Sequence, residues 1–323
     1  MAKLAGDQLL DIISISMEKA SVDGQPFLKA LSDGHVYDCA IVDNKQLLTT
    51  DFGPLVGEDF RTAGRIASLN ALSDIYVNGG MPKYAMVIMV LANEMSLEDG
   101  SNLLAGILEV CSQERVAICG GHTIRGEEPI VGLSVIGELF SDRIINKEGS
   151  MEGDRIWISK PLGTGLALRG YSNNLLSHTG YDEAISVMLE SNGIVTHKAL
   201  SVSDGLHAMT DVTGFGLLGS LIEMLTPSQG AVLRKKNIPL LQSVFNLDPA
   251  LSLSRYILNN YHYANSLKNV ELSFDDIASL SVFDPQTNGP VLVIADKKVK
   301  LNEIDGQFRC IGEVVNSNEI TLV

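Results

Sequence analysis

The chain has 323 residues and a mass of 34.8 kDa, which suggests about two domains and allows a hydrophobic core without metal or disulfide staples. Lys and Arg number 24 against 39 Asp and Glu, so the net charge of −15 argues against a broad nucleic-acid or anionic-membrane surface, because both need a basic footprint. The four cysteines lack CxxC or zinc-ligand spacing, no apolar run suits a bilayer and no secretory signal is visible, so we expect reduced thiols, no membrane span and a cytoplasmic location.

The hydrophobic pattern of the first half predicts alternating strands and helices. A helix is expected over 60–78, because its apolar residues recur every three or four positions and two glycines follow. A second helix is expected from a capping box at Ser96 to about residue 113. Runs rich in apolar and β-branched residues predict the strands of this half, at 37–42, 46–50, 84–92, 116–119 and 130–139.

The second half predicts a separate unit of mixed strands and helices. We interpret residues 152–154 as the joint between two domains, at 1–150 and 151–323. The elements expected after the joint are a strand at 155–160, a glycine-rich turn at 161–165, helices at 181–191, at 194–202 and after Gly214, a strand at 290–295 and a short pair of strands at the C-terminus. The pattern predicts two α/β or α+β domains.

Four aspartates stand at the ends of predicted elements or among apolar neighbours. Asp38 lies inside a strand pattern, where a carboxylate is costly unless it is paired or metal-bound. Asp51 ends the next strand, Asp74 follows Asn70 by one turn of the long helix, and Asp211 precedes a glycine-rich turn. Each alone also fits a cap, a surface charge or a turn. No comparable set of Lys or Arg accompanies them, so together they favour Mg²⁺ bound against the polyphosphate of a nucleotide.

Two glycine-rich stretches have alternative readings. The segment 214–219 spells GxGxxG, but a dinucleotide site is disfavoured because no continuous buried strand is expected before it and the region about 20 residues later is basic. The stretch 120–123 follows a short strand, and its amides and the Thr123 hydroxyl fit either phosphate binding or a tight turn. P-loop, HExxH and GxSxG motifs are absent, and the histidines have no ligand spacing.

Six phrases together resemble one enzyme family, the selenophosphate synthetases (selenide, water dikinases) of the aminoimidazole ribonucleotide synthetase-like superfamily. These phrases are LTTDFG, GRIASLNALSDIYVNGGMP, AICGGHTIRGEEPIVGLSVIGEL, ISKPLGTG, MTDVTGFGLLG and DPQTNGP. The resemblance implies an N-terminal α/β dimerisation domain, a C-terminal α+β domain and a homodimer. It also implies a Mg²⁺-dependent reaction in which ATP, selenide and water give selenophosphate, orthophosphate and AMP.

The same resemblance implies roles for individual residues. The matches to metal-binding aspartates are Asp38, Asp74 and Asp211. Lys3 matches a catalytic lysine that contacts the β- and γ-phosphates. The matches to other nucleotide-binding residues are Asp51, Asp74, the stretch His35, Val36 and Tyr37, and the partner-reaching stretch Gly121, His122 and Thr123.

The chain also departs from the family pattern. The Cys or selenocysteine that handles selenium would lie before residue 1, so it is absent from this sequence. Arg125 replaces an acid, Ser220 replaces a histidine, DPQTNGP replaces DPQTSGG, and a Gly-Gly-Thr segment is missing around 255–265. Two alternatives therefore stay open: a related ATP-dependent kinase or synthetase with another acceptor, and a non-catalytic nucleotide-binding homologue.

Overall fold

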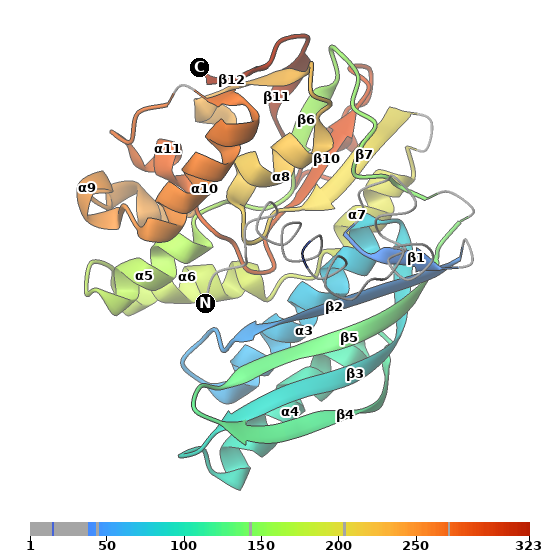
Figure 1. Ribbon diagram of the computed structural model, residues 1–323, viewed down its shortest axis with the longest axis vertical. Coiled ribbons are helices and arrows are strands. Elements are labelled where there is room, and N and C mark those ends of the chain that lie inside the picture. The colour runs from blue at the N-terminus through green and yellow to red at the C-terminus, as the bar shows by residue number, and fades with distance from the viewer. Residues whose placement is uncertain (1–14, 16–37, 43–44, 142–143, 203–204, 271) are drawn as a thin grey trace.

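The computed structural model describes residues 15, 38–42, 45–141, 144–202, 205–270 and 272–323. These residues form two sheets, each packed against helices, and the two units share an interface (Figure 1). The predicted roles of Lys3, His35, Val36 and Tyr37 lie outside the described residues. In the described ranges, no helix combines the length and the apolar character needed to cross a membrane.

The N-terminal domain is built on a five-stranded sheet in the order β1-β2-β5-β3-β4. Its neighbouring strands are antiparallel except β3 and β4, which run parallel. Its elements are β1 (Ala40–Val42), β2 (Gln46–Pro54), α3 (Phe60–Val77), β3 (Gly80–Ala92), α4 (Leu97–Gln113), β4 (Ala117–Gly126) and β5 (Ile130–Leu139). The two predicted helices are confirmed, and each predicted strand overlaps an observed one. Two placements are corrected, because Asp38 lies before β1 and not inside a strand, and Asp51 lies within β2 and not at its end. Helices α3 and α4 cover one face of the sheet (Figure 1).

Local signals explain both helices. The Asp59 carboxylate caps α3 by accepting from the backbone N of Thr62 at 2.9 Å, and Ser96 and Asp99 form the predicted capping box of α4. The two helices pack closely because glycine stands at each contact. A Cβ added to Gly64 would lie 2.1 Å from the carbonyl oxygen of Leu103, so a larger residue would force the helices apart.

Strand β4 is longer than expected and corrects the reading of the glycine pair. The predicted strand stops at residue 119, but β4 continues to Gly126 as an edge strand beside β3. A Cβ on Gly121 would lie 2.3 Å from the carbonyl oxygen of Val87. Gly121 therefore allows β4 to approach β3 closely, and the tight-turn alternative is wrong.

The C-terminal domain is built on a seven-stranded sheet in the order β7-β10-β6-β11-β8-β12-β9. Its elements are β6 (Arg155–Ile158), α5 (Thr164–Ser172), α6 (His178–Met188), α7 (Gly193–Leu200), β7 (Leu206–Asp211), α8 (Gly216–Met224), β8 (Gly230–Leu233), η2 (Lys235–Asn237), η3 (Gln242–Asn246), α9 (Pro249–Ser252), α10 (Arg255–Leu267), β9 (Asn269–Val270), α11 (Ile277–Ser281), β10 (Val291–Ala295), α12 (Leu301–Ile304), β11 (Arg309–Val315) and β12 (Glu319–Leu322). The two short strands predicted at the C-terminus are confirmed as β11 and β12, and β8 lies between them in the sheet.

Strand β7 also corrects the sequence argument about the GxGxxG segment. A buried strand does precede it, contrary to expectation. However, β7 is an edge strand, and its neighbour in the described sheet, β10, is antiparallel. The parallel βαβ unit of a dinucleotide-binding fold is therefore not built here.

Helix α3 belongs to the interiors of both domains. Leu69 and Leu72 are buried in the N-terminal core with the residues of α4 and the sheet. Ile66 is buried in the main core of the C-terminal domain, and Val77 joins a second C-terminal cluster that includes Trp157. This helix therefore fixes the two domains against each other and carries Asp74 along their interface.

Candidate functional site

Four aspartates from distant parts of the chain lie close enough to influence one another's charge. Asp38 lies two residues before β1, Asp51 lies on β2, Asp74 on α3 and Asp211 at the end of β7. Burial raises the pKa of Asp74 well above its ordinary value, and the negative charges of Asp211, Asp38 and Asp51 raise it further. Thr49 donates to Asp74 Oδ2 at 2.6 Å and opposes the rise. The fold therefore concentrates negative charge at the domain interface.

Lys147 is a cation of this region that the sequence analysis missed. Its Nζ lies 2.7 Å from Asp38 Oδ1 and 2.7 Å from Glu223 Oε2, and all three side chains are largely removed from water. Burial opposes the charge of Lys147, but the two carboxylates outweigh this and raise the pKa of the ammonium group. The sequence shows no set of Lys or Arg comparable to the aspartates, and Lys147 adds a single cation beside Asp38.

The donor chemistry of the region fits Mg²⁺, which prefers oxygen ligands. Asp38 Oδ2 is buried and has no hydrogen-bond partner among the described residues. Across those same residues, no three His, Cys, Asp or Glu side chains are grouped closely enough to surround one ion. Mg²⁺ in nucleotide enzymes is usually bound by one or two carboxylates, water and substrate phosphates, so an open set of carboxylates suits it better than a closed protein cage.

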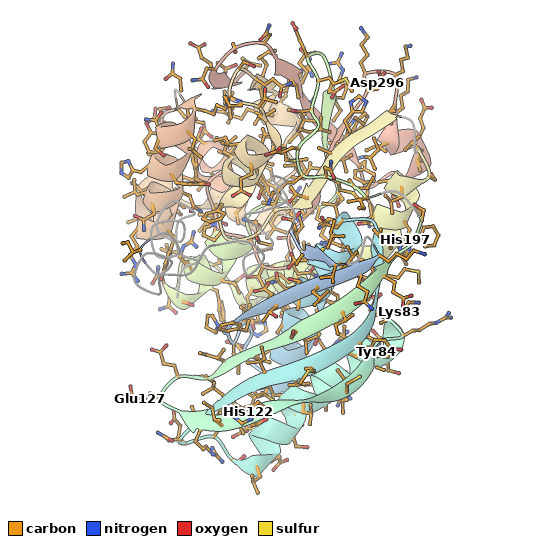
Figure 2. All side chains as sticks on the ribbon, turned by 45° about the vertical axis from the view of Figure 1, so that its right-hand side comes forward. Lys83, Tyr84, His122, Glu127, His197 and Asp296 are labelled. Atoms are coloured by element: carbon orange, nitrogen blue, oxygen red, sulfur yellow. The ribbon has the colours of Figure 1, made fainter. Side chains whose placement is uncertain are left out.

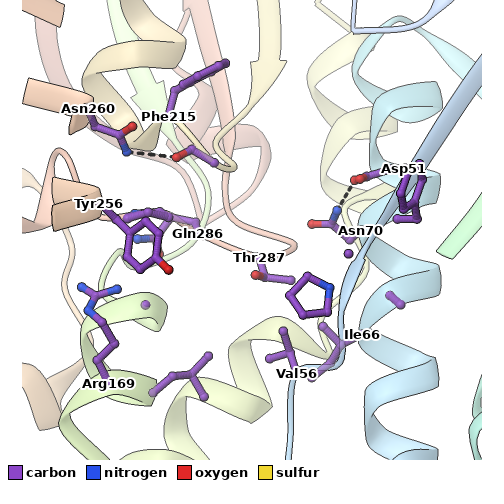
Figure 3. Close-up of a pocket in the computed structure, with 18 of the residues that line it drawn as sticks. Asp51, Val56, Ile66, Asn70, Arg169, Phe215, Tyr256, Asn260, Gln286 and Thr287 are labelled. Carbon is purple, nitrogen blue, oxygen red and sulfur yellow. Dashed lines mark hydrogen bonds between the residues drawn. The ribbon is translucent and has the colours of Figure 1, made fainter. Parts of the chain in front are cut away.

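A cavity of about 700 Å³ lies between the two domains, and of the four aspartates Asp51 lines it (Figure 3). Its volume is in the range that holds small organic ligands. On the N-terminal side it is lined by β2 and α3, including Asp51 and Asn70, and on the other side by α5, α10 and the segment 285–287. Aromatic and amide side chains predominate near Tyr256 on α10.

Asn70 joins the two sides of this cavity. Its Nδ2 donates to Asp51 Oδ2, and its Oδ1 accepts from the backbone N of Asn288 at 2.5 Å (Figure 3 shows the first bond). Sequence analysis placed Asn70 only on the same helix face as Asp74. The contact with Asn288 had no sequence signal, since the two residues are 218 positions apart.

The segment that carries Asn288 is anchored inside the C-terminal domain. The buried Asp284 carboxylate accepts from the backbone N of Leu166 at 2.8 Å and from Arg169 at 2.5 Å. Burial raises the pKa of Asp284, and Arg169 opposes the rise. Lys160 donates to the carbonyl oxygen of Asn288 at 3.0 Å, and burial lowers the pKa of Lys160 to about 7. The DPQTNGP motif is therefore a rigid projection toward α3.

Gly121, His122 and Thr123 are not brought to the four aspartates within one chain. They lie on the exposed edge strand β4, and β5 and β3 separate β4 from β2 (Figure 2 shows His122). Arg125, on the same strand, donates to the carbonyl oxygens of Ala92 at 2.8 Å and Met95 at 2.6 Å. The guanidinium of Arg125 therefore stabilises the turn between β3 and α4 in its own domain.

The face of the N-terminal sheet opposite α3 and α4 is open and apolar. The strand registers place its outward side chains on one surface (Tyr84 is labelled in Figure 2). Five large apolar residues there are each at least 40% exposed: Phe52, Tyr84, Met86, Ile124 and Ile136. A patch of this kind marks an interaction surface on a folded protein.

Two family models match the chain almost end to end. Residues 36–139 match "AIR synthase related protein, N-terminal domain", and residues 151–323 match "AIR synthase related protein, C-terminal domain". The selenide, water dikinase of Aeromonas hydrophila is 35% identical over 268 residues, covering 81% of this chain and 76% of that protein. The selenide, water dikinase of Treponema denticola is 31% identical over 271 residues, covering 82% and 74%.

A solved structure shares the fold at low sequence identity. AaThiL complexed with AMPPCP and TMP has a TM-score of 0.70 and 17% identity, covering 100% of this chain and 95% of the other. The two-domain fold described above is therefore that of the AIR synthase related proteins.

Proposed function

Because the chain belongs to the AIR synthase related family and, within it, to the selenide, water dikinases, we propose that it makes selenophosphate from selenide, ATP and water in a Mg²⁺-dependent reaction. The other products are AMP and orthophosphate. The observation that carries the proposal is the convergence of Asp38, Asp51 and Asp211 on Asp74, whose pKa is raised by burial and then by these like charges.

Each of the four aspartates has a role in this proposal. Asp38, Asp74 and Asp211 would hold Mg²⁺, which neutralises phosphate oxygens when it is bound. The backbone carbonyl of Asp211 accepts from Ser220, the residue that replaces the family histidine, at 3.3 Å. Asp51 would contact the nucleotide from β2. Most of the catalysis would come from positioning and electrostatics, as in other phosphoryl transfers.

Four more contacts are proposed from the first 37 residues. Lys3 would contact the β- and γ-phosphates as a point charge. His35, Val36 and Tyr37 would contact the nucleotide just before Asp38. These roles rest on the family motifs alone.

The proposed assembly is a homodimer formed through the open face of the N-terminal sheet. Pairing two copies there would cover the exposed apolar residues of β2, β3, β4 and β5. Gly121, His122 and Thr123 would then reach the nucleotide of the partner subunit. Met86→Asp should convert the dimer to monomers in light scattering, whereas Leu108→Asp, at an exposed leucine of α4, should not. A dimer that survives the first change would contradict this interface.

The activity is tested by product analysis with ³¹P NMR and nucleotide chromatography. AMP and orthophosphate that form only when selenide is added would support selenophosphate synthesis. Nucleotide binding without turnover, under reducing conditions and with selenide present, would favour the non-catalytic alternative.

The interdomain cavity favours a second candidate, a kinase with another acceptor. Its C-terminal wall includes Leu168, Tyr256 and Asn260, which offer apolar and amide contacts to an organic acceptor that selenide and water do not need. ADP formed only with an organic acceptor, and no response to selenide, would replace the first proposal with this one.

A further inference from the structure

The amide of Asn70 is bound from two sides by groups of opposite type. The backbone N–H of Asn288 can only donate, so the oxygen of the Asn70 amide must face it, at 2.5 Å. The amide nitrogen must then face Asp51, whose carboxylate accepts from it. Only one orientation of the Asn70 side chain satisfies both neighbours, so the amide links Asn288 to Asp51.

The donor at Asn288 is fixed by the C-terminal domain. Asn288 is fully buried and has a left-handed backbone conformation, with φ of 45°. Its Nδ2 donates to the carbonyl oxygens of Met188 at 2.7 Å and Glu190 at 2.9 Å, and its own carbonyl accepts from Lys160 at 3.0 Å. The backbone N–H of Asn288 therefore points at Asn70 from a rigid support.

We infer that Asn70 is a positioning residue, which transmits the placement of the segment 284–290 to the carboxylate of Asp51. This inference rests on the proposed role of Asp51 in nucleotide binding. Asn70, Asp51, Gln286 and Thr287 also line the interdomain cavity together (Figure 3). Through Asn70, the C-terminal domain sets the affinity of a nucleotide that is bound mainly by the N-terminal domain.

A second contact between the same segment and the same helix supplies a matched control. Asn192 donates to Ser73 Oγ at 2.9 Å and to the carbonyl oxygen of Gly289 at 3.0 Å. Ser73 lies one turn after Asn70 on α3 and is fully buried. This contact joins the two domains through Ser73 and Gly289 and does not include the hydrogen bond between Asn70 and Asp51, so its loss should affect stability and not nucleotide affinity.

The experiment measures AMPPCP affinity by calorimetry in the presence of Mg²⁺, with thermal unfolding of each variant in parallel. Asn70→Ala should weaken binding by roughly tenfold or more, the usual effect of losing a partner that orients a ligating group. Asn70→Asp keeps an oxygen for Asn288 but places an oxygen against Asp51. It should therefore bind AMPPCP at least as poorly as Asn70→Ala, because the added carboxylate repels Asp51. Ser73→Ala should bind like the wild type.

Comparing the AMPPCP affinity and the unfolding temperature of the two Asn70 variants distinguishes a positioning role from a purely structural one. A merely structural residue would make Asn70→Asp the milder change in both measurements, and that result would overturn the inference. In a double-mutant cycle, Asn70→Ala should have no further effect once Asp51 is replaced by alanine, and additive effects would also overturn it.

Two controls distinguish this inference from the proposed function. If the wild type binds AMPPCP and the Asn70 variants bind equally well, only the inference fails. If the wild type does not bind AMPPCP, or Asp51→Ala binds normally, the proposed role of Asp51 fails and the inference fails with it.

Discussion

Burial raises the pKa of both Asp74 in the N-terminal domain, which is half-buried, and Asp284 in the C-terminal domain, which is fully buried, but their surroundings are opposite. Asp284 accepts hydrogen bonds from Leu166 N and Arg169, and Arg169 counters the rise in its pKa caused by burial. Around Asp74, burial and three further carboxylates all raise the pKa. A buried acid whose partners are built into the fold supports the fold, whereas one crowded by like charges requires a cation from outside.

Replacing Arg169 by Met should give the largest effect, a loss of about 3 to 5 kcal/mol in the free energy of unfolding at neutral pH. The pKa of Asp284, already raised by burial, should rise further without the guanidinium. When the pKa of a carboxyl group is higher in the folded state than in the unfolded state, the folded protein loses stability as the pH rises through that range. The stability deficit of Arg169→Met relative to the wild type should therefore grow from pH 4 to pH 8 in urea denaturation.

A matched cation on the surface is the control for Arg169. Lys300 pairs with Glu303 at 3.1 Å, and both side chains are 66% exposed. Lys300→Met should change the free energy of unfolding by less than about 0.5 kcal/mol at every pH. A deficit of Arg169→Met that is independent of pH would contradict the account of Asp284.

Replacing Lys147 by Met should cost about 2 kcal/mol, because Asp38 and Glu223 lose a charged hydrogen-bond donor. Mg²⁺ should stabilise this variant more than the wild type, since the metal can then offset the charge of Asp38. Thermal unfolding with and without Mg²⁺ measures both effects. Equal stabilisation of the two proteins would show that Asp38 is not open to the metal.

Asp74→Asn should weaken binding of Mg²⁺ with AMPPCP at least tenfold, or about 1.4 kcal/mol, while the free energy of unfolding stays the same or rises. The rise is expected because the change removes a charge that its neighbours oppose. Glu94, exposed between β3 and α4, supplies the control Glu94→Gln. If Asp74→Asn loses stability and retains affinity, Asp74 supports the fold, as Asp284 does, and does not bind the metal.

Arg125→Gln should have the smallest effect, a loss of at most about 1 kcal/mol in stability and none in AMPPCP affinity. The reason is that its guanidinium is bound to the carbonyl oxygens of Ala92 and Met95. Calorimetry and urea denaturation of the variant check both statements. A marked loss of affinity would mean that Arg125 reaches the phosphates.

The sequence predicted the elements that are fixed by neighbouring residues. The periodicity of α3 and the capping box of α4 are local signals, and both helices end close to their predicted bounds. The order of the last strands and the length of β4 depend on pairing with distant strands, so local pattern could not predict them.

The same limit applies to the site. Asp38, Asp51, Asp74 and Asp211 were recognisable because carboxylates among apolar residues need a partner. The residues that pair with these aspartates could not be predicted from the sequence. Lys147 meets Asp38 across 109 positions, and no pattern in an acidic chain marks one lysine for that contact.

The dual burial of α3 has a consequence for motion. Ile66 and Val77 are inserted into the C-terminal interior, while Leu69 and Leu72 are inserted into the other one. If one domain rotated away from the other, apolar side chains on the face of α3 that packs against that domain would become exposed to water. Ligand entry should therefore proceed by movement of surface segments, and thermal denaturation should melt the whole molecule in one step.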